Sequence, residues 1–598
     1  MKIKVSDYIA NFLIEKGITD IFTVVGGGAM HLNDSFGHNP GLNCIYNHHE
    51  QASAIAAEAY SRINPNMAVC CVTSGPGAIN ALNGVVGAYQ DSIPMLVFSG
   101  QTKTTLTVKK SGLNLRTLGN QEFDIVSTLK NVVKYSEMIV NASDIKYCLE
   151  KAYSIAKSGR PGPCWLDIPL DIQGTYIEID NLKSYNEEKE DVDVTDVINI
   201  IKEKFAVSER PIIYAGNGIR LSGGYEVFNQ LIKKYQIPVV TCWDSIDLIA
   251  TDDSLYCGRA GTMGDRAGNF AVQNSDLLIC IGTRLNIYQV GYNVNTWARA
   301  AYTVVVDIDS EELKKPTIRV DLPICCDANI FMKSLLDANF NNTVRNNWIN
   351  QCQQWKTRYP VVTKSQKEEK GVVNVYNFID KLSRNLSKKT ITVVTNGSAS
   401  VVGSAAYFIK KDDRFIMNCG LSSMGYGLPA AIGACIANEK KSVICIEGDG
   451  SIMMNLQELQ TMVTNSLPIK LFIINNGGYH QIRQTQNNIF HNGLIGVGPE
   501  SKDLGFPNFR LLAKCFGIPY YSITNNLKQE NIIKKIVASK TYILCEVFVS
   551  TTQNFEPKSA TKKLEDGSLF SPPLEDLAPF LSREELESNM YIPLIDNK

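Results

Sequence analysis

Two short polar segments hold the side chains with the clearest capacity for chemistry. Gly448-Asp449-Gly450-Ser451 is a glycine turn, and Asn475-Asn476 follows it, with residues 451–474 between Gly450 and Asn475. Asp449 offers a carboxylate and Asn476 an amide oxygen, and Mg2+ takes oxygen ligands of these kinds together with phosphate oxygens. A glycine turn also exposes backbone N–H groups that bind phosphate. The pair predicts a site for magnesium and a phosphorylated ligand, provided that the fold brings the two segments together.

The sequence around these segments predicts a unit that places them side by side. Ser442–Ile446 and Ile469–Ile474 are short apolar runs, typical of buried strands. Between them, apolar residues recur at helical spacing from Ile452 to Val463, and the helix is expected to begin near Ser451. A strand–helix–strand unit makes its strands parallel, so both end at the sheet edge where α/β proteins bind ligands. Without this spacing, the glycine turn alone would be an ordinary tight turn.

Length and composition limit the class of protein. At 598 residues the chain is too long for one core, and about three or four domains are expected. Its net charge of -1 argues against partners held by electrostatics alone, such as nucleic acid or a membrane surface. The sixteen cysteines include no CxxC pair, which favours free thiols in a reducing compartment. No apolar run reaches membrane-spanning length, so we expect a cytoplasmic protein.

Strands and helices alternate through most of the chain, which predicts an α/β fold with three doubly wound parallel-sheet domains. The charged stretch 184–195 is the best candidate for a linker. The expected domains are residues 1–183, 195–345 and 371–550, followed by a tail at 551–598. The tail keeps some apolar residues, and we expect it to be ordered and to lie over the domains.

Glu50 is the main candidate for a functional residue in the first domain. It follows the short strand Asn43–Asn47 and begins an alanine-rich helix, Gln51–Arg62. A carboxylate at a helix start is ordinarily explained by the helix dipole alone. Its place at the carboxyl end of a strand also allows a role in a binding site.

Four segments carry a resemblance to a known family: HHEQASAIAAEAYSR at residues 48–62, TSGPGAIN at 73–80, SSMGYGLP at 422–429, and GDG followed by NN. Together they resemble the thiamine-diphosphate-dependent enzymes of the acetolactate synthase family. The resemblance implies thiamine diphosphate and Mg2+ as cofactors. It also implies a homodimer or homotetramer whose active sites lie between a pyrimidine-binding domain of one subunit and a diphosphate-binding domain of another.

The same resemblance assigns roles to individual residues. Glu50 would hydrogen-bond the aminopyrimidine ring and activate the cofactor, Met424 would lie under the cofactor, and the Ser422 backbone would accept from its amino group. The implied metal ligands are Asp449, Asn476 and the Gly478 carbonyl. The resemblance implies Glu50 and Gln121 as catalytic residues, and we add His480 and Gln481, which lie where the chain departs from the family. The implied cofactor-binding residues are Gly27, Glu50, Pro76, Asn80, Gly397, Ser398, Ser422, Met424, Gly448, Asp449, Gly450, Ser451, Asn476, Gly478 and Tyr479.

The central domain has glycines and acids at its strand ends, as nucleotide-binding sheets do. Relatives place FAD or ADP there, and Gly261-Thr262-Met263-Gly264 and Arg284 fall at similar positions. FAD is therefore an option, with a structural role only, because the expected reaction has no net redox step.

The stretch after Asn476 departs from the family. His480 and Gln481 replace the family's glycine and methionine, and Thr485 replaces a bulky tryptophan that shapes the acceptor pocket. A larger, more polar pocket favours a carboligase that decarboxylates a 2-oxo acid such as pyruvate. It would add the two-carbon unit to a polar ketone, for example a nucleotide-linked keto-sugar. Two alternatives remain open: the acetolactate synthase reaction itself, and hydrolysis of a cyclic dione on the same scaffold. A non-catalytic relative is disfavoured because Glu50, Asp449 and Asn476 are all present.

Overall fold

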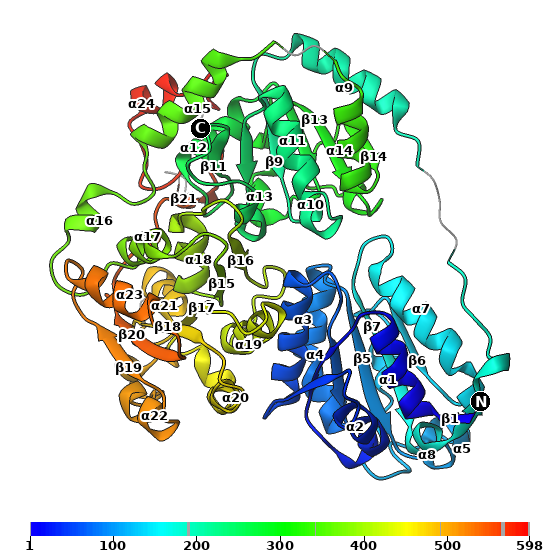
Figure 1. The fold of residues 1–598 in the computed structure, drawn as a ribbon. Helices are drawn as coiled ribbons and strands as arrows, with labels where there is room; N and C mark the ends of the chain where they lie inside the picture. The colour runs from blue at the N-terminus through cyan, green and yellow to red at the C-terminus, as the bar shows by residue number, and fades with distance from the viewer. Residues whose placement is uncertain (1, 188–191, 341–342, 491, 564–568, 596–598) are drawn as a thin grey trace.

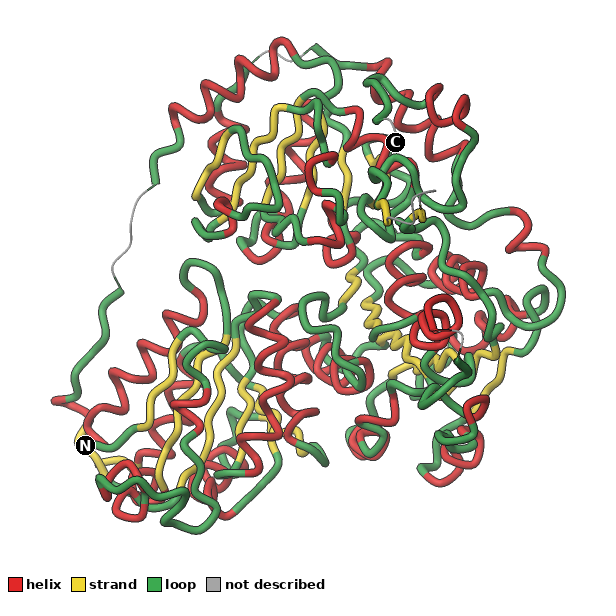
Figure 2. The backbone as a smooth tube through the Cα atoms, turned by 180° about the vertical axis from the view of Figure 1, so that it is seen from behind, coloured by secondary structure: helices red, strands yellow, loops and turns green. Residues whose placement is uncertain are grey.

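The computed structural model describes residues 2–187, 192–340, 343–490, 492–563 and 569–595. Residues 188–191 of the predicted linker therefore lie outside the described part. The described chain forms three six-stranded sheets, each flanked by helices on both faces (Figures 1 and 2). The neighbouring strands of these sheets are parallel, which confirms the predicted fold class of three doubly wound α/β domains.

The amino-terminal sheet has the strand order β3-β2-β4-β5-β7-β6. Its strands are β2 (Asp20–Thr23), β3 (Asn43–Tyr46), β4 (Val69–Val72), β5 (Met95–Gln101), β6 (Tyr135–Met138) and β7 (Pro163–Pro169). Its longer helices are α1 (Val5–Glu15), α2 (Met30–Gly37), α3 (Glu50–Ile63), α4 (Pro76–Gln90) and α7 (Ile145–Lys157). The short helices are α5 (Val108–Ser111), α6 (Ile125–Thr128) and α8 (Leu170–Gly174). A separate antiparallel pair joins β1 (Lys2–Lys4) to β8 (Tyr176–Glu178).

The central sheet has the order β11-β10-β9-β12-β13-β14. Its strands are β9 (Pro211–Ala215), β10 (Val239–Thr241), β11 (Tyr256–Arg259), β12 (Leu277–Ile281), β13 (Tyr302–Asp307) and β14 (Leu322–Cys325). The helices are α9 (Thr195–Val207), α10 (Gly218–Leu221), α11 (Tyr225–Tyr235), α12 (Arg266–Asn274), α13 (Ile287–Val290) and α14 (Ala328–Asp337). Two further helices, α15 (Asn346–Arg358) and α16 (Lys364–Glu368), lead to the third sheet.

The carboxyl-terminal sheet has the order β16-β15-β17-β18-β20-β19. Its strands are β15 (Ile391–Val394), β16 (Arg414–Ile416), β17 (Val443–Gly448), β18 (Ile469–Asn475), β19 (Tyr520–Ile523) and β20 (Ile543–Phe548). Its helices are α17 (Val375–Asn385), α18 (Ser398–Ala406), α19 (Gly427–Ala437), α20 (Glu458–Thr464), α21 (His480–Thr485), α22 (Phe509–Cys515) and α23 (Gln529–Val537). Strands β17 and β18 are neighbours, with Gly448 opposite Ile474, so the turns that carry Asp449 and Asn476 do leave the same sheet edge.

The helix expected to begin near Ser451 begins later. A 3-10 turn covers Ile452–Met454, and α20 starts only at Glu458. The reason is a pair of bonds to a residue earlier in the chain: the Asn455 side chain donates to the Gly425 carbonyl at 2.8 Å, and the Ser451 hydroxyl accepts from the Gly425 N–H at 2.8 Å. These bonds tie the segment to the turn before α19, and a regular helix from Ser451 would not make them.

Helices α3 and α19 join the first and third domains of the chain (Figure 1). Small residues let them approach closely: a Cβ atom on Gly433 would lie 1.9 Å from the Ala56 carbonyl oxygen. Alanines of α3 and α19 therefore share one apolar core, which includes Ala56, Ala59, Ala430 and Ala434. This packing fixes the two domains against each other within a single chain.

The segment after β20 crosses to the central domain. It forms the short pair β21 (Lys562–Lys563) and β22 (Leu569–Phe570) and then α24 (Arg583–Ser588). Leu574, Leu577 and Leu586 are buried in a core with Trp348 and Trp355 of α15. The tail is thus part of the folded body and packs on the central domain.

Candidate active site

A pocket of about 260 Å³ opens at the carboxyl ends of β15, β17 and β18. We call it the C-terminal pocket. Its walls contain most of the residues that the sequence assigned to magnesium and diphosphate. The lining residues are Asn396, Gly397, Ser398, Ala399, Met424, Gly448, Asp449, Gly450, Ser451, Ile474, Asn476, Gly478, Tyr479, His480, Gln481 and Ile482.

Asp449 is held by backbone donors on both carboxylate oxygens. Oδ1 accepts from the Gly450 N–H at 2.8 Å, and Oδ2 accepts from the Gly478 N–H at 2.9 Å. Burial raises the pKa of Asp449 to about 7, while these backbone bonds and the Arg483 charge act in the other direction. A buried carboxylate oriented in this way is a ready ligand for a cation, which would compensate its charge.

Asn476 provides the observation that tests the fit to a metal. Its Nδ2 donates to the Ser398 hydroxyl at 3.0 Å, which fixes the orientation of the amide. Its Oδ1 is buried and has no hydrogen-bond partner among the described residues. A buried acceptor without a partner costs free energy, and a bound hard cation would supply that partner. The residues present therefore fit Mg2+.

The wall beside this pair is built for the close approach of a ligand. Gly397 lies at the start of α18 with a φ of 62°, in the left-handed region, and no atom lies within 4 Å of the place where its Cβ would be. Ser398, buried next to it, is the residue that holds Asn476. Ser451 uses its hydroxyl to bind the Gly425 N–H and the Thr395 hydroxyl, and its carbonyl accepts from the Met454 N–H at 3.1 Å, so the residue is held on several sides.

Ser422 and Met424 lie on the turn that precedes α19. Ser422 has a φ of 53°, and the Asn396 side chain donates to its carbonyl oxygen at 3.2 Å. Met424 is half-buried and lines the C-terminal pocket, and its role under the cofactor stays a prediction.

A second group of predicted residues surrounds Glu50 in the first domain, and we call it the Glu50 cluster: Gly27, Glu50, Pro76, Asn80 and Gln121. Glu50 is the first residue of α3, and Asn80 donates to its Oε2 at 3.0 Å. A Cβ atom on Gly77, next to Pro76, would lie 3.3 Å from Glu50 Oε1. The helix starts of α3 and α4 thus bring Glu50, Pro76 and Asn80 together.

Gly27 and Gln121 are less closely tied to Glu50. Gly27 begins a 3-10 turn after β2 and has open space where a Cβ would lie. The Gln121 side chain is exposed, and its backbone carbonyl lies against Gly75, just before Pro76. Within one chain, the described residues that line the C-terminal pocket all belong to the third domain, and Glu50 is not among them.

The acceptor-side residues take three different positions. His480 is buried, its Nε2 lies 2.7 Å from the Gln553 carbonyl oxygen, and burial lowers its pKa. Gln481 is exposed at the pocket, whereas the Thr485 hydroxyl donates to the Gln481 carbonyl one helical turn earlier. His480, Gln481 and Thr485 therefore do not form one polar cluster. The His480 ring is bonded to the Gln553 backbone, and the Thr485 hydroxyl is bonded within α21.

Tyr479 and Gly478 are fixed by the segment that follows α21. The Tyr479 N–H donates to the Val497 carbonyl at 2.8 Å, and its ring packs edge-on against Phe506. Gly478 has a φ of 114°, and its carbonyl accepts from the His480 N–H at 3.0 Å. The carbonyl oxygen keeps one lone pair for a metal.

Two residues near the site were missed from the sequence. Glu458 is fully buried, and its Oε1 accepts from the His48 N–H at 3.0 Å, two residues before Glu50. Arg483 donates to the carbonyls of Asn476 at 3.1 Å and Gly477 at 2.7 Å, so it holds the turn that carries a predicted metal ligand. The available signals were an acid between the apolar residues Leu456 and Leu459, and a basic residue one helical turn after Tyr479.

A second cavity opens at the carboxyl ends of β9, β12 and β13, where FAD was expected, and we call it the central cavity. Arg284 lines it, together with Asn217, Gly282 and Asp307. Gly261–Gly264 does not: the Thr262 N–H donates to the Tyr288 carbonyl at 2.7 Å, and the Thr262 carbonyl accepts from the Ser559 N–H at 2.6 Å. Arg284 therefore lies at the cavity as expected, whereas the expected glycine turn faces protein, so FAD stays a prediction.

Comparison with known proteins identifies the family. Three family models match the chain: the N-terminal TPP binding domain of thiamine pyrophosphate enzymes at residues 3–127, their central domain at 198–335, and their C-terminal TPP binding domain at 395–547. None of the helices in the described part has the length and apolar character needed to span a bilayer.

Curated relatives match along almost the whole chain. The acetolactate synthase large subunit of Lactococcus lactis subsp. lactis (strain IL1403) is 32% identical over 558 residues, covering 92% of this chain and 93% of the relative. That of Cyanidium caldarium is 31% identical over 575 residues, covering 93% and 94%. Acetolactate synthase 1, chloroplastic, of Oryza sativa subsp. japonica is 28% identical over 567 residues, covering 93% and 86%. The chain therefore belongs to the acetolactate synthase-like family of thiamine-pyrophosphate-dependent enzymes, which form C–C bonds.

Proposed function

We propose that this enzyme decarboxylates a 2-oxo acid such as pyruvate and transfers the two-carbon unit to a second 2-oxo acid, the reaction for which its relatives are named. The observation that carries the proposal is the unpartnered, buried Oδ1 of Asn476 beside the Asp449 carboxylate, which together suit a magnesium-bound diphosphate.

Thiamine diphosphate, when bound, supplies the carbanion chemistry that breaks and forms the C–C bonds. The protein residues bind and orient it. Asp449, Asn476 and the Gly478 carbonyl would hold Mg2+, and the Gly397 and Gly450 turns would admit the phosphates. Glu50, oriented by Asn80, would exchange a proton with the pyrimidine side of the cofactor, and Met424 would support its middle.

The two halves of this site come from different subunits in our proposal, so the enzyme is at least a homodimer. Glu50 does not line the C-terminal pocket of its own chain. Exposed apolar side chains also gather at the strand ends around the Glu50 cluster: Val25, Met30, Tyr46 and Ile79. Such a patch is typical of a protein–protein interface. A dimer in which this face meets the partner's C-terminal pocket would cover it.

A polar ketone as acceptor is the second candidate. The observation in its favour is Thr485, a small exposed residue where the family has a tryptophan, beside the exposed amide of Gln481. A nucleotide-linked keto-sugar belongs to this class of acceptor. Because His480 is bonded to Gln553 and Thr485 to Gln481, only the Gln481 side chain offers a free polar group, and the 2-oxo acid acceptor is the better supported reading.

Product analysis tests both candidates. Purified enzyme with Mg2+, thiamine diphosphate and pyruvate should release CO2 and form acetolactate, detected by mass spectrometry. Adding a panel of keto-sugars and finding acetylated sugar instead would support the second candidate. No CO2 from pyruvate, but cleavage of a cyclic dione, would replace both with the hydrolase.

Two further expectations remain proposals. The purified protein's absorption spectrum decides whether FAD is bound, and a flavin would take no part in the proposed reaction. We also propose a cytoplasmic location, which the sixteen free cysteines support, because a reducing compartment keeps thiols in this form.

A further inference from the structure

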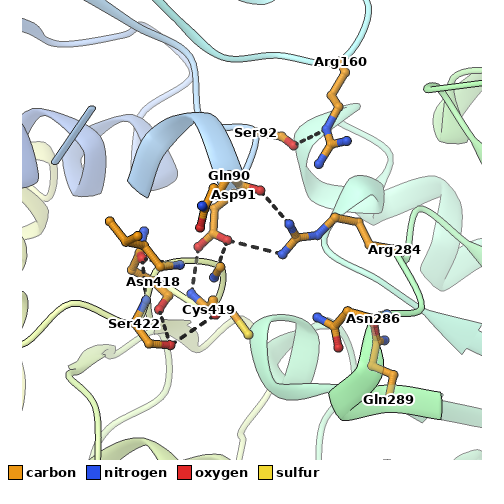
Figure 3. A network of polar contacts seen from close by, with 12 residues as sticks. Gln90, Asp91, Ser92, Arg160, Arg284, Asn286, Gln289, Asn418, Cys419 and Ser422 are labelled. Carbon is orange, nitrogen blue, oxygen red and sulfur yellow. Dashed lines mark hydrogen bonds and ion pairs between the residues drawn. The ribbon is translucent and has the colours of Figure 1, made fainter. Parts of the chain in front are cut away.

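Asp91 occupies the point where the three domains of the chain meet. It follows α4, and its side chain is only 3% exposed. Oδ2 accepts from the Cys419 N–H at 2.8 Å and from Arg62 at 2.7 Å. Oδ1 accepts from the Gly420 N–H at 2.8 Å, and Arg284 of the central domain lies 3.5 Å away (Figure 3). One carboxylate thus binds two consecutive backbone N–H groups of another domain.

The backbone that Asp91 holds leads directly into the turn before α19. Asn418 Oδ1 accepts from the N–H groups of Leu421 at 3.2 Å and Ser422 at 3.1 Å, and the Ser422 hydroxyl donates to the Cys419 carbonyl at 3.2 Å (Figure 3). Ser422 has a left-handed φ of 53°, which a residue with a side chain keeps only when its surroundings hold it there. The turn therefore depends on anchors outside itself.

The space around Gly420 shows how closely the turn approaches Asp91. A Cβ atom on Gly420 would lie 2.8 Å from Asp91 Oδ1 and 2.8 Å from the Gln90 Cβ. The contact between Asp91 and the turn thus requires a residue without a side chain. If Asp91 served only to pair with Arg62 and Arg284, the Cys419–Gly420 backbone would not need to approach its carboxylate so closely.

We propose that Asp91 is a positioning residue for the cofactor: by holding the Cys419–Gly420 backbone it sets the conformation of the turn that carries Ser422 and Met424. This inference rests on the proposed function, because it takes that turn to grip the pyrimidine side of the cofactor. In this proposal, the first domain of each chain also supports the part of the cofactor site that lies in the third domain of the same chain. The Glu50 cluster of that first domain would meanwhile serve the neighbouring subunit.

The test compares cofactor affinity in Asp91→Asn and a matched control. The asparagine keeps the size of the side chain, but its NH2 group cannot accept from Cys419 or Gly420. We expect the Kd for Mg2+–thiamine diphosphate, measured by quenching of protein fluorescence, to rise about 10- to 100-fold, since charged hydrogen bonds of this kind are worth about 1.5–3 kcal/mol. Arg284→Met removes the partner 3.5 Å from Asp91 Oδ1 and a hydrogen bond to the Gln90 carbonyl at 2.7 Å, but neither bond from Asp91 to the Cys419–Gly420 backbone, so it should change the Kd less than about threefold.

Glu575→Gln is the control, because Glu575 is also a buried carboxylate paired with an arginine, Arg299, at 2.7 Å, but it joins the tail to the central domain. It should lose thermal stability and keep the wild-type Kd. The near-ultraviolet circular dichroism of bound cofactor should change at saturation in Asp91→Asn and not in Glu575→Gln. A wild-type Kd and an unchanged spectrum in Asp91→Asn would overturn the proposal, whatever its effect on stability.

Gly420→Ala provides a second route if Asp91→Asn fails to fold. It leaves the Asp91 charge in place and pushes the turn away from it, so the same loss of affinity is expected, and wild-type affinity would again overturn the proposal. Binding is measured without substrate. A wild-type enzyme that binds the cofactor but does not decarboxylate pyruvate would therefore refute the proposed function and leave this test intact.

Discussion

Glu458 of the third domain accepts a hydrogen bond from the Asn47 side chain of the first domain at 2.9 Å. Its other oxygen accepts from the His48 N–H at 3.0 Å, and the Thr461 hydroxyl donates to Oε2 at 2.7 Å. The domain that carries the predicted metal ligands thereby also fixes the strand end that presents Glu50. This contact lies inside one chain, across the interface made by α3 and α19.

Glu458→Gln should lower kcat about 10- to 100-fold, because a small displacement of a catalytic group costs about this much. A glutamine must point its NH2 group at one of two N–H donors, which moves the Asn47–His48 backbone and with it Glu50. The affinity for Mg2+–thiamine diphosphate should change little, since the C-terminal pocket is untouched. Steady-state kinetics and cofactor titration check both points, and a wild-type kcat would show that the contact has no role in positioning.

Glu50→Gln should lower kcat about 100- to 10,000-fold, the usual contribution of a group that transfers a proton. The amide keeps the size of the side chain, so the cofactor should still bind within a few-fold of wild-type affinity. Pyruvate consumption and cofactor titration on the same preparation provide the comparison. Near-normal turnover in this variant would remove Glu50 from the proposed mechanism.

Removal of the metal should release the cofactor. EDTA should abolish activity, and added Mg2+ should restore it. Asn476→Ala deletes the unpartnered Oδ1 and should raise the Mg2+ concentration for half-maximal activity about 10- to 100-fold, in line with the loss of a ligand contact to a charged group. Ser398→Ala removes only the hydroxyl that orients this amide at 3.0 Å and should have a smaller effect. An unchanged metal requirement in Asn476→Ala would exclude it as a ligand.

The sequence alone predicts those parts of the site whose positions follow from the order of strands and helices along the chain. Parallel strands on either side of a helix must end at one edge, so Asp449 and Asn476 were predicted to lie together, and β17 and β18 are neighbours. Contacts between domains were not predictable in this way. Nothing local to Glu458 or Asp91 shows that each side chain meets a segment hundreds of residues distant, in another domain. The break between Ser451 and Glu458 was missed for the same reason, since its cause is a bond to Gly425.

Asp167 predicts a pH dependence of stability. It is buried on β7, accepts from the Ser99 hydroxyl at 2.6 Å and the Gln101 amide at 3.1 Å, and burial raises its pKa to about 7 from 3.8. The charges of Asp124 and Lys109 act on it in opposite directions. Between these two pH values the folded chain holds a proton that the unfolded chain has lost, so this group lowers the free energy of unfolding as pH rises.

Asp167→Asn should abolish this contribution. Relative to wild type, the variant should gain stability between pH 4 and 7, by at least about 1 kcal/mol, since one pKa unit corresponds to about 1.4 kcal/mol. The difference should level off above pH 7. Thermal unfolding across this range measures it, and a difference that does not vary with pH would show that Asp167 is ionised in the folded protein throughout.

Thr485→Trp tests what selects the acceptor. Thr485 is exposed at the end of α21, one turn from Gln481, and a tryptophan there would fill the space that the small side chain leaves open. The ratio of product from a small 2-oxo acid to product from a larger ketone should rise at least about tenfold, because loss of room for even one methylene costs a factor of about 10–200. Thr485→Val keeps the volume and deletes only the hydroxyl, which is bonded to the Gln481 carbonyl, so it should leave the ratio unchanged. Competition assays with both acceptors in one reaction give this ratio directly. An equal ratio in wild type and Thr485→Trp would mean that the acceptor binds away from Thr485, and this position would then have no part in selecting it.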